Sequence, residues 1–470
     1  LTHMPSTEAG GPKPGTREAL AAFFERRALV MMALGFAAGL PFLLIFDTLS
    51  AWLREVGLSL EVIGFSSLAT LVYSFKFLWA PLVDRTRVPV LTDWVGHRRS
   101  WMLVCQAFII VGLWLVAGTD PGLHLGRMAF FAVCVGFISA TQDIAIDAWR
   151  IESASLDQQG AMVAAYQLGY RVALITGGAG ALGIAQGYGW ATSYTVMATL
   201  AAIGIVTTFL VREPVIAANQ TATDQEARVV AWLAARPHWP QPLRNFGAAF
   251  IGAVICPFTD YFARYGLQVA VVTLALISTY RLTEFTMGSM ANPFYIDHGY
   301  SLGQIAAIVK AIGLPVSMAG VIAAGFIIAK AGLRIALFLG SVLIALSNLG
   351  FALLATTDAP LLFGLGAINA LDMLAQGVHG TALIAFLSGL TSTRYTATQY
   401  ALFSSLYAIF GKLLEGTSGF VVDAIGYPAF FTYTASLSLP GLLLLVWLTR
   451  RGLLDWHGKI STRDGQESAR

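Results

Sequence analysis

Residues 140–150 read Ala-Thr-Gln-Asp-Ile-Ala-Ile-Asp-Ala-Trp-Arg and place two carboxylates in an otherwise apolar run. In a helix, Asp143 and Asp147 lie one turn apart and Arg150 continues the same face, which we call the charged face. The preceding residues 128–139 are almost wholly apolar, so this face lies toward the end of a predicted membrane span. Carboxylates are costly there unless they line a cavity or find partners, which makes them functional candidates. The alternative is structural, with both acids only fastening the helix to a neighbour or a loop.

The composition is that of a polytopic membrane protein. Hydrophobic residues make up 56% of the 470 residues and charged residues only 12%, against roughly 25% charged residues in soluble domains. Spans of about 20 residues with short connections leave room for roughly a dozen helices. Apolar runs such as residues 103–111 do not alternate with polar residues, which argues against a transmembrane barrel. The expected fold class is therefore an all-α polytopic bundle in the lipid bilayer.

The sequence contains no recognisable metal site, cofactor motif or enzymatic centre. Its three cysteines are scattered through apolar or amphipathic segments, at Cys105, Cys134 and Cys256. Their odd number and spacing predict buried thiols rather than disulfides or metal ligands. There is no His-Glu zinc spacing, no activated serine and no large soluble domain, which disfavours an enzyme or a receptor. We expect no metal, no cofactor and no nucleic-acid partner.

Twelve membrane spans are expected, with both ends of the chain on one side. Their predicted bounds are 28–52, 61–83, 100–118, 125–149, 157–186, 190–211, 267–291, 302–329, 333–355, 360–390, 396–422 and 428–449. With this assignment, Arg54 and Arg127 are the only basic residues assigned to the side opposite the N-terminus. Because cytoplasmic loops are enriched in Lys and Arg, both termini are predicted to be cytoplasmic. The polar first 27 residues carry no cleavable signal.

Two six-helix halves are expected, joined by a linker. We assign residues 1–27 to a cytoplasmic tail, 28–211 and 267–449 to the halves, 212–266 to a cytoplasmic linker and 450–470 to a second tail. Residues 246–265 of the linker predict an amphipathic or re-entrant helix on the cytoplasmic face. The sequence Gly-Tyr-Gly-Trp at 187–190 aligns with Ala-Ile-Gly-Tyr at 424–427, which superposes Tyr170 on Tyr407. Such a repeat predicts pseudo-symmetric halves with a substrate site between them.

The loop after the second span resembles the loop motif of the major facilitator superfamily. It reads Leu-Val-Asp-Arg at 82–85 and Gly-His-Arg-Arg at 96–99, and a degenerate copy at 325–334 follows the eighth span. The resemblance implies the major facilitator fold. It also implies that the acid of the loop pairs with arginine and with the end of a neighbouring helix, and so latches a gate. The residues assigned to gating are Asp84, Arg85, Arg98 and Arg99, together with Arg150 at the end of the charged face.

Further segments resemble the AmpG-type anhydromuropeptide permeases of the same superfamily. They lie at 76–85, 139–150, 168–171, 280–284, 310–314 and 397–402. The resemblance implies proton-driven import of N-acetylglucosaminyl-1,6-anhydro-N-acetylmuramyl peptides from periplasm to cytoplasm, across the bacterial inner membrane, for peptidoglycan recycling. The Gln-Asp-Ile-x-x-Asp core at 142–147 is shared with acetyl-CoA transporters and some siderophore importers. A related facilitator for another bulky anion, such as a siderophore complex or a coenzyme A thioester, is therefore the alternative.

A ligand that joins a disaccharide to a carboxylate-bearing peptide needs cations, hydrogen-bonding groups and a stacking surface. Arginine suits carboxylates best, because its planar guanidinium can donate two parallel hydrogen bonds. The residues expected to bind substrate are Lys76, Gln142, Tyr166, Gln167, Tyr170, Arg171, Tyr280, Arg281, Lys310 and Gln376. The depth of each residue along its helix favours an ion pair between Lys76 and Asp143. The spacing of Lys412 and Glu415 favours a structural pair.

Proton coupling requires a carboxylate that changes its charge near neutral pH. In general, burial raises the pKa of a carboxylate and a neighbouring cation lowers it. The residues that qualify by position are Asp143, Asp147, Glu284 and Asp372. We expect protonation of Asp143 or Asp147 to release a partner and permit the closing motion. His379 has a suitable solution pKa, although helix packing is the more common role of such a histidine. The expected assembly is a monomer.

Overall fold

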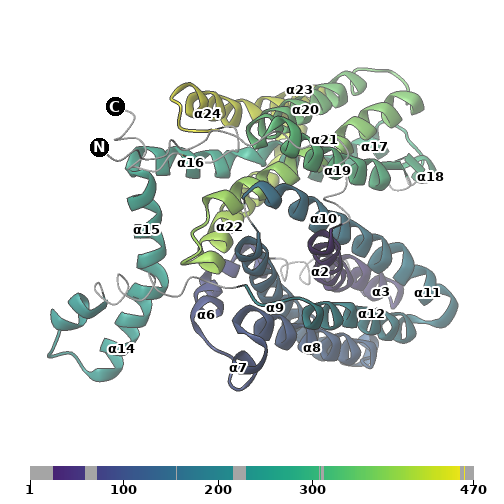
Figure 1. Cartoon of the computed structure of the whole chain (residues 1–470). Coiled ribbons are helices and arrows are strands. Elements are labelled where there is room, and N and C mark those ends of the chain that lie inside the picture. Colours follow the sequence, from purple (N-terminus) through teal and green to yellow (C-terminus); the bar gives the residue numbers. More distant parts are fainter. Residues whose placement is uncertain are drawn as a thin grey trace.

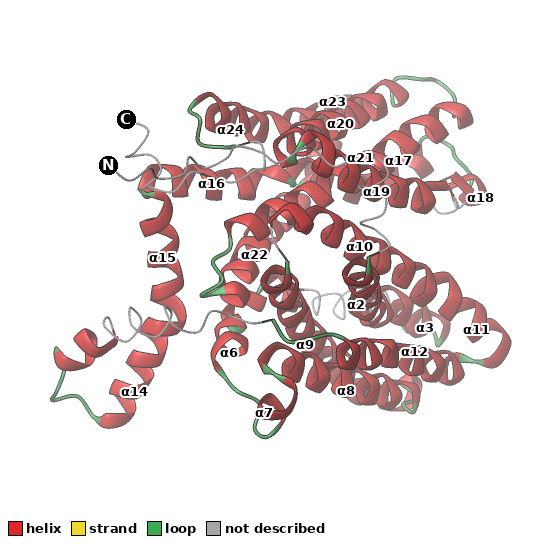
Figure 2. Ribbon diagram, viewed as in Figure 1, coloured by secondary structure: helices red, strands yellow, loops and turns green. Residues whose placement is uncertain are grey.

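The chain is described by a computed structural model over residues 25–58, 71–154, 156–214, 229–305, 307–308, 312–455 and 460. Within these ranges the regular structure is helical, apart from one β-bridge between Leu454 and Ile460 (Figure 2). Ten helices of the described ranges are long and apolar enough to cross a membrane. The prediction of an all-α membrane protein is therefore confirmed.

The first half of the chain forms one bundle. Its helices are α2 (Arg26–Leu43), η2 (Leu44–Thr48), α3 (Leu49–Glu55), α5 (Leu71–Ser74), η4 (Lys76–Leu78), α6 (Ala80–Arg85), α7 (Leu91–Val95), α8 (His97–Ala117), α9 (Pro121–Ser153), α10 (Leu156–Ile175), η5 (Thr176–Gly180), α11 (Ala181–Tyr188) and α12 (Trp190–Leu210). The π-helical turn η2 follows Pro41, which lacks the N–H for a regular helical bond. The π-helical turn η5 contains Gly177, Gly178 and Gly180, within the fifth predicted span.

The linker and the second half are also helical. The linker contains α14 (Gln241–Phe250), η6 (Ile251–Ile255) and α15 (Cys256–Tyr265). The second half contains α16 (Leu267–Tyr280), α17 (Leu282–Asp297), α18 (Leu302–Ile305), α19 (Gly313–Ala331), α20 (Leu333–Leu354), α21 (Leu362–Leu390), α22 (Thr396–Glu415), α23 (Ser418–Ser436) and α24 (Ser438–Arg450). The linker segment predicted at 246–265 is thus a helix, interrupted by one π-helical turn.

The two halves lie side by side. In Figure 1 the helices from α2 to α12 occupy the lower part of the molecule and those from α16 to α24 the upper part. Helix α10 contacts α19 and α21, while α22 contacts α6 and α9, so these helices join the halves. Helix α14 lies at the lower left of Figure 1, and α15 leads from it to α16 while contacting α22. We call one end of the bundle the basic end, because Arg85, Arg98, Arg150 and Arg264 lie at its helix termini.

Two glycines reproduce the predicted internal repeat in the backbone. Gly189, between α11 and α12, has φ 83° and ψ 161°, and Gly426, inside α23, has φ 74° and ψ 165°. Only glycine adopts such a positive φ at no steric cost. Gly426 therefore bends the long helical segment Ser418–Arg450 between the eleventh and twelfth predicted spans. The same backbone corner thus closes the fifth span in one half and the eleventh span in the other.

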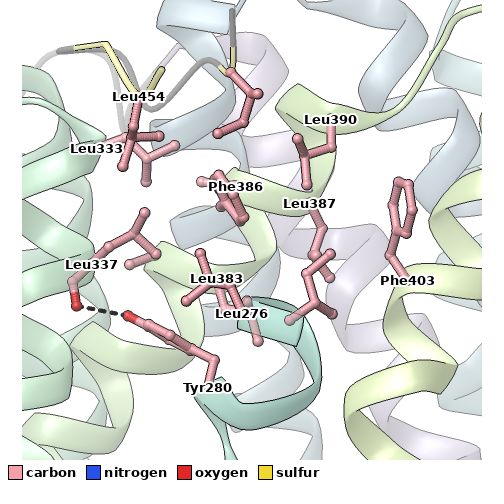
Figure 3. Close-up of a cluster of buried hydrophobic side chains, with 14 of the residues drawn as sticks. Leu276, Tyr280, Leu333, Leu337, Leu383, Phe386, Leu387, Leu390, Phe403 and Leu454 are labelled. Carbon is pink, nitrogen blue, oxygen red and sulfur yellow. Dashed lines mark hydrogen bonds between the residues drawn. The ribbon is translucent and has the colours of Figure 1, made fainter. Parts of the chain in front are cut away.

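A buried apolar cluster in the second half fixes the position of Tyr280 (Figure 3). Its members come mainly from α16, α20, α21 and α22, with further residues from α9, α10, α15 and α24 and from the segment after α24, where Leu454 lies. The Tyr280 hydroxyl donates a hydrogen bond of 2.8 Å to the main-chain oxygen of Leu337. The side chain is almost fully buried. Tyr280, predicted to bind substrate, is therefore a core residue whose hydroxyl already has a partner.

Candidate transport site

The charged face of α9 forms an ion-pair group at the interface between the two halves. Arg150 Nη2 lies 3.1 Å from Asp147 Oδ1, one helical turn away as predicted. Lys76 Nζ lies 4.0 Å from Asp147 Oδ2. The predicted partner of Lys76 was Asp143, so that assignment is corrected, although Asp143 also feels the charge of Lys76. Asp147 is thus the acid that carries two cationic neighbours.

The local backbone explains which acid Lys76 reaches. Lys76 opens the 3-10 turn η4, and the helix is broken on both sides of this turn, at Phe75 and Trp79. Pro81 follows in the first turn of α6, where its missing N–H costs nothing. The interruption turns the lysine relative to a continuous helix. The depths calculated from the rise of a regular helix therefore predicted Asp143, and not Asp147, as the partner of Lys76.

Asp143 has a different environment. Its Oδ1 atom is buried and has no hydrogen-bond partner among the described residues. The tyrosines Tyr73, Tyr166 and Tyr170 are its electrostatic neighbours, and the rings of Tyr166 and Tyr170 lie 6.3 Å apart. A carboxylate oxygen without a partner, among aromatic rings, is available to a proton or to a hydroxyl of a ligand. This agrees with the predicted roles of Asp143, Tyr166 and Tyr170 without testing them.

Gln142, predicted to bind substrate, has a structural contact instead. Its side-chain amide donates a 3.1 Å hydrogen bond to the main-chain oxygen of Ala37, and the residue is buried. The bond fastens α9 to α2. The structure thus shows Gln142 as a link between helices, and its role in substrate binding stays a prediction.

A second charged group lies in the other half, around Glu284. Its carboxylate accepts hydrogen bonds from Arg281, one of them 2.8 Å long from Nε to Oε2. The two residues lie three positions apart, and the backbone departs from helical geometry at Arg281, between α16 and α17. His379 Nδ1 lies 3.5 Å from Glu284 Oε2. The Arg281 guanidinium also lies over the rings of Phe285 and Tyr407, at 5.2 and 5.3 Å.

The contact between His379 and Glu284 was not predicted from the sequence, which favoured a role in helix packing for His379. Asp372 accepts hydrogen bonds from Ser347, at 2.9 Å, and from Gln376, at 2.7 Å. Asp372 was predicted to carry a proton and Gln376 to bind substrate, and the structure joins the buried Asp372 to the partly buried Gln376. Asp372 has no ion-pair partner within the described chain.

The first half contributes one further cation near Glu284. Arg171 of α10 interacts electrostatically with Glu284, Arg281 and Tyr170. It makes no hydrogen bond or ion pair to any residue that the structure describes. Gln167, one turn earlier on α10, faces Gly380 of α21. Arg171 is therefore the cation of the described centre with the most freedom to bind an anion. Lys310, also predicted to bind substrate, lies outside the described residues.

The contacts that the loop motif implies for a gate latch, between Asp84, arginine and a helix end, are present at the basic end. Arg98 Nη2 lies 2.7 Å from Asp84 Oδ1 and 2.7 Å from Glu152 Oε1. Asp84 also accepts hydrogen bonds from the main-chain nitrogens of Ala397 and Thr398, at 3.1 and 2.8 Å. These are the first N–H groups of α22, where a carboxylate is favoured by the helix dipole. A loop acid of one half thus caps a helix of the other, and Glu152 is a partner that the motif did not indicate.

The other predicted gating residues also lie at the basic end. Arg150 is fully buried, donates to Ser388 Oγ at 2.8 Å and lies over the Tyr400 ring at 5.3 Å. It therefore ties Asp147 to α21 and α22 of the other half. Arg85 lies against Gly252 of the linker turn η6. Arg99 donates to the main-chain oxygens of Thr208 and Phe209, at the end of α12, which is a contact within its own half.

The linker helix contacts the same end of α22. Gln399 accepts a hydrogen bond of 2.9 Å from Arg264 and donates one of 3.0 Å to Asp260. Arg264 also reaches the main-chain oxygen of Leu390 at 3.2 Å. These contacts hold α15 beside the Asp84 latch. Among the described residues no group of three or more His, Cys, Asp or Glu is arranged to hold a metal ion.

Comparison with known proteins agrees with this architecture. The sequence pattern of the Major Facilitator Superfamily matches residues 76–414, and the chain belongs to this superfamily of membrane transporters. A second pattern, described as Acetyl-coenzyme A transporter 1, matches residues 27–121. The protein is thus a transporter and not an enzyme.

Relatives place the chain more closely, among the AmpG-type transporters. It is 33% identical to the Anhydromuropeptide permease of Escherichia coli, over 90% of this chain and 80% of the relative. It is 31% identical to the transporter AmpG 4 of Rickettsia felis, over 91% of this chain and 98% of the relative. The predicted resemblance to this group is confirmed.

Solved structures support the fold. The proton:xylose symporter XylE bound to 6-bromo-6-deoxy-D-glucose superposes with a TM-score of 0.68 at 12% identity, covering 96% of this chain and 99% of that one. The transporter FucP in its outward conformation gives a TM-score of 0.62 at 11% identity, covering 91% and 99%. The predicted fold of two six-helix halves is confirmed by these likenesses, which at such identities concern the fold alone.

Proposed function

We propose that the protein imports anhydromuropeptides from the periplasm to the cytoplasm, coupled to protons, by alternating access. The single observation that carries this proposal is the 33% identity to the Anhydromuropeptide permease of Escherichia coli over 90% of this chain. The proposal takes the basic end as the cytoplasmic side, because cytoplasmic loops are rich in Lys and Arg. Both termini then lie in the cytoplasm and the chain acts as a monomer in the bacterial inner membrane.

The central residues suit such a ligand chemically. Arg171 and Arg281 offer guanidinium groups to the carboxylates of a stem peptide. Tyr166 and Tyr170 offer rings and hydroxyls to a disaccharide. Gln167 faces the second half from α10 and can donate or accept. The ligand would thus bridge the two halves at the level where α10 meets α21.

Asp147 is the acid that we assign to the gate. It holds Arg150, which in turn bonds to Ser388 and stacks on Tyr400 of the other half. A proton on Asp147 removes the charge that fixes Arg150, and the contacts that close the basic end weaken together. Asp143, with its unpartnered oxygen one turn deeper, is the neighbouring acid from which a proton can reach Asp147. A proton that enters from the periplasm binds Asp143 first and then passes to Asp147. Its arrival at Asp147 weakens the pair with Arg150, so proton entry is linked to opening on the cytoplasmic side.

Uptake into proteoliposomes tests this function. The labelled ligand is an N-acetylglucosaminyl-anhydromuramyl tripeptide, and uptake is compared with and without an imposed inward proton gradient. We expect the gradient to stimulate uptake by the unaltered protein, and Asp147→Asn to bind the ligand without responding to the gradient. A folded protein that neither binds nor moves the ligand would refute the assignment.

A second candidate rests on the match of residues 27–121 to the pattern described as Acetyl-coenzyme A transporter 1. A coenzyme A thioester is also a bulky anion, and its phosphates would seek the same arginines. Unlabelled acetyl-coenzyme A added in excess separates the two. Competition with muropeptide uptake favours this candidate, and undiminished uptake favours the permease.

A further inference from the structure

We propose that His379 takes up a proton when a substrate carboxylate displaces Glu284 from Arg281. The inference rests on the proposed function, because it requires that Arg281 bind an anionic ligand. It adds a proton acceptor in the second half of the transporter, at a residue that sequence reasoning assigned to helix packing. It also couples the uptake of one proton to substrate binding, independently of the acids of the charged face.

The carboxylate of Glu284 lies between the two groups that compete for it. Arg281 holds it with two hydrogen bonds, and His379 Nδ1 lies 3.5 Å from Oε2. That imidazole nitrogen is buried and makes no hydrogen bond within the described chain. The ring is therefore in contact with the acid but not yet bonded to it. It is placed to receive Glu284 as soon as Arg281 turns away.

The orientation of the ring is fixed by its packing. His379 stacks on Tyr280 with ring centres 4.0 Å apart and planes at 9°, and the Tyr280 hydroxyl is held by the Leu337 oxygen. The His379 backbone is held close to α20, because a Cβ atom added to Gly340 would lie 2.8 Å from the His379 Cα atom. Packing accounts for the stacked ring. It does not require that the ring nitrogen face a carboxylate, which a phenylalanine at this position would avoid.

Charge balance gives the contact a function. Tyr280, Arg281 and Glu284, on α16, α17 and the turn between them, are the charged and titratable groups next to His379 in the described chain. Arg171 and Tyr170 on α10, Asp372 on α21 and Tyr407 on α22 surround the pair of Arg281 and Glu284 in turn. In the substrate-free state Arg281 and Glu284 neutralise each other. A substrate carboxylate bound to Arg281 leaves Glu284 as an uncompensated anion, which is costly in a buried site.

A proton on His379 restores the balance. The imidazolium then pairs with Glu284, and Arg281 pairs with the substrate carboxylate. One negative charge and one proton enter together, so the net charge of the site does not change. An imidazole is suited to this step, because its solution pKa of about 6.5 allows both charge states near neutral pH. Asp372, held by Ser347 and Gln376, stays outside the exchange.

Proton uptake on ligand binding tests the exchange. The purified transporter is titrated with the anhydromuramyl tripeptide in weakly buffered detergent solution containing a pH-sensitive dye. His379→Phe keeps a ring against Tyr280 but removes the titratable nitrogen, and His379→Gln is the second variant. We expect each variant to take up about one proton fewer per ligand than the unaltered protein, and to bind the ligand roughly tenfold more weakly or worse. The acids of the charged face are common to all variants, so their contribution cancels.

A second substitution distinguishes proton exchange from packing. Glu284→Gln removes the anion that His379 must neutralise, so His379→Phe should no longer weaken binding when it is combined with Glu284→Gln. A double variant as much weakened as His379→Phe alone would assign His379 to packing and overturn the proposal. Unchanged proton uptake in His379→Phe would overturn it as well, while the permease function stands. Absence of ligand binding by the unaltered protein would overturn both.

Discussion

The two halves of the transporter hold their buried charges in opposite ways. In the first half, Asp147 and Arg150 form a pair whose contacts continue into the second half, through Ser388 and Tyr400. In the second half, Glu284 is held by Arg281 and faced by His379, all from that half. The first group therefore depends on how the halves are docked. The second group can rearrange while the halves stay in place.

This difference assigns separate tasks to the two groups. We infer that a charge pair tied across the interface reports and controls the state of the gate, since opening must break it. A pair closed within one half is better suited to sense a ligand, since it can exchange partners before any movement. The following predictions test that division of tasks, and they run from the largest expected effect to the smallest.

Replacing Arg150 with alanine has the largest expected effect. The fully buried guanidinium is bonded to Asp147, Gln159 and Ser388. Its removal leaves Asp147 with Lys76 at 4.0 Å. Loss of one partner of a buried ion pair costs about 3–5 kcal/mol, so both the thermal midpoint in detergent and the uptake rate should fall sharply.

The control for this variant is an ion pair exposed to solvent. Arg87 lies 2.9 Å from Asp93, and both side chains are more than two-thirds exposed, at 72% and 73%. Arg87→Ala should cost about 0–1 kcal/mol and leave uptake unchanged. If Arg150→Ala and Arg87→Ala have equal thermal midpoints, the large stabilising contribution assigned to Arg150 is wrong.

Asp147→Asn addresses the gate without removing a side chain. The amide keeps the shape of the carboxylate but cannot hold Arg150 as an ion. We expect gradient-driven uptake to fall at least roughly tenfold, while ligand binding in detergent is retained. His379→Phe should do the reverse and lower ligand affinity. If both variants lose affinity alike, the division between a gate pair and a ligand pair is wrong.

Short-range features were predictable from the sequence, and long-range ones were not. The charged face follows from positions within one helix, so Asp147 and Arg150 meet as expected. The partner of Lys76 depends on the helix breaks at Phe75 and Trp79, which the apolar pattern does not reveal. The loop motif indicated that Asp84 would meet a helix end, but only the fold brings Thr398 to it.

The second half shows the same limit. His379 and Glu284 lie on different helices, and the break at Arg281 turns the acid toward the histidine. Spacing along one helix cannot reveal a contact of this kind. Gln142 was predicted to contact the ligand because it is a polar residue beside two acids, and the sequence did not reveal that the nearby α2 backbone offers its amide a partner. Sequence reasoning thus identified the polar residues of the site better than their pairings.

Gln142→Ala tests whether Gln142 acts as a link between helices or as a ligand contact, and a moderate effect is expected. The variant loses the hydrogen bond that fastens α9 to α2, at the Ala37 oxygen. A single buried neutral hydrogen bond contributes about 1 kcal/mol, so the thermal midpoint should decrease slightly. Ligand affinity, measured by calorimetry, should stay that of the unaltered protein. A large loss of ligand affinity at an unchanged thermal midpoint would show instead that Gln142 binds the substrate.

The smallest expected effect belongs to Ser388→Ala, which removes one neutral partner of Arg150 at the interface between the halves. The matched control is Ser347→Ala, because Ser347 also has a hydrogen bond with a charged group, donating to Asp372, but within its own half. A bond of this kind contributes about 0.5–1.5 kcal/mol, which changes a two-state population by roughly twofold to tenfold. Spin labels on α6 and α22 report the distance across the basic end. Ser388→Ala should raise the fraction of open molecules in this measurement, whereas Ser347→Ala should leave it unchanged, because its bond does not cross the interface. If the two variants shift the distances equally, contacts within the second half also set the gate, and the contrast between the two charged groups loses its basis.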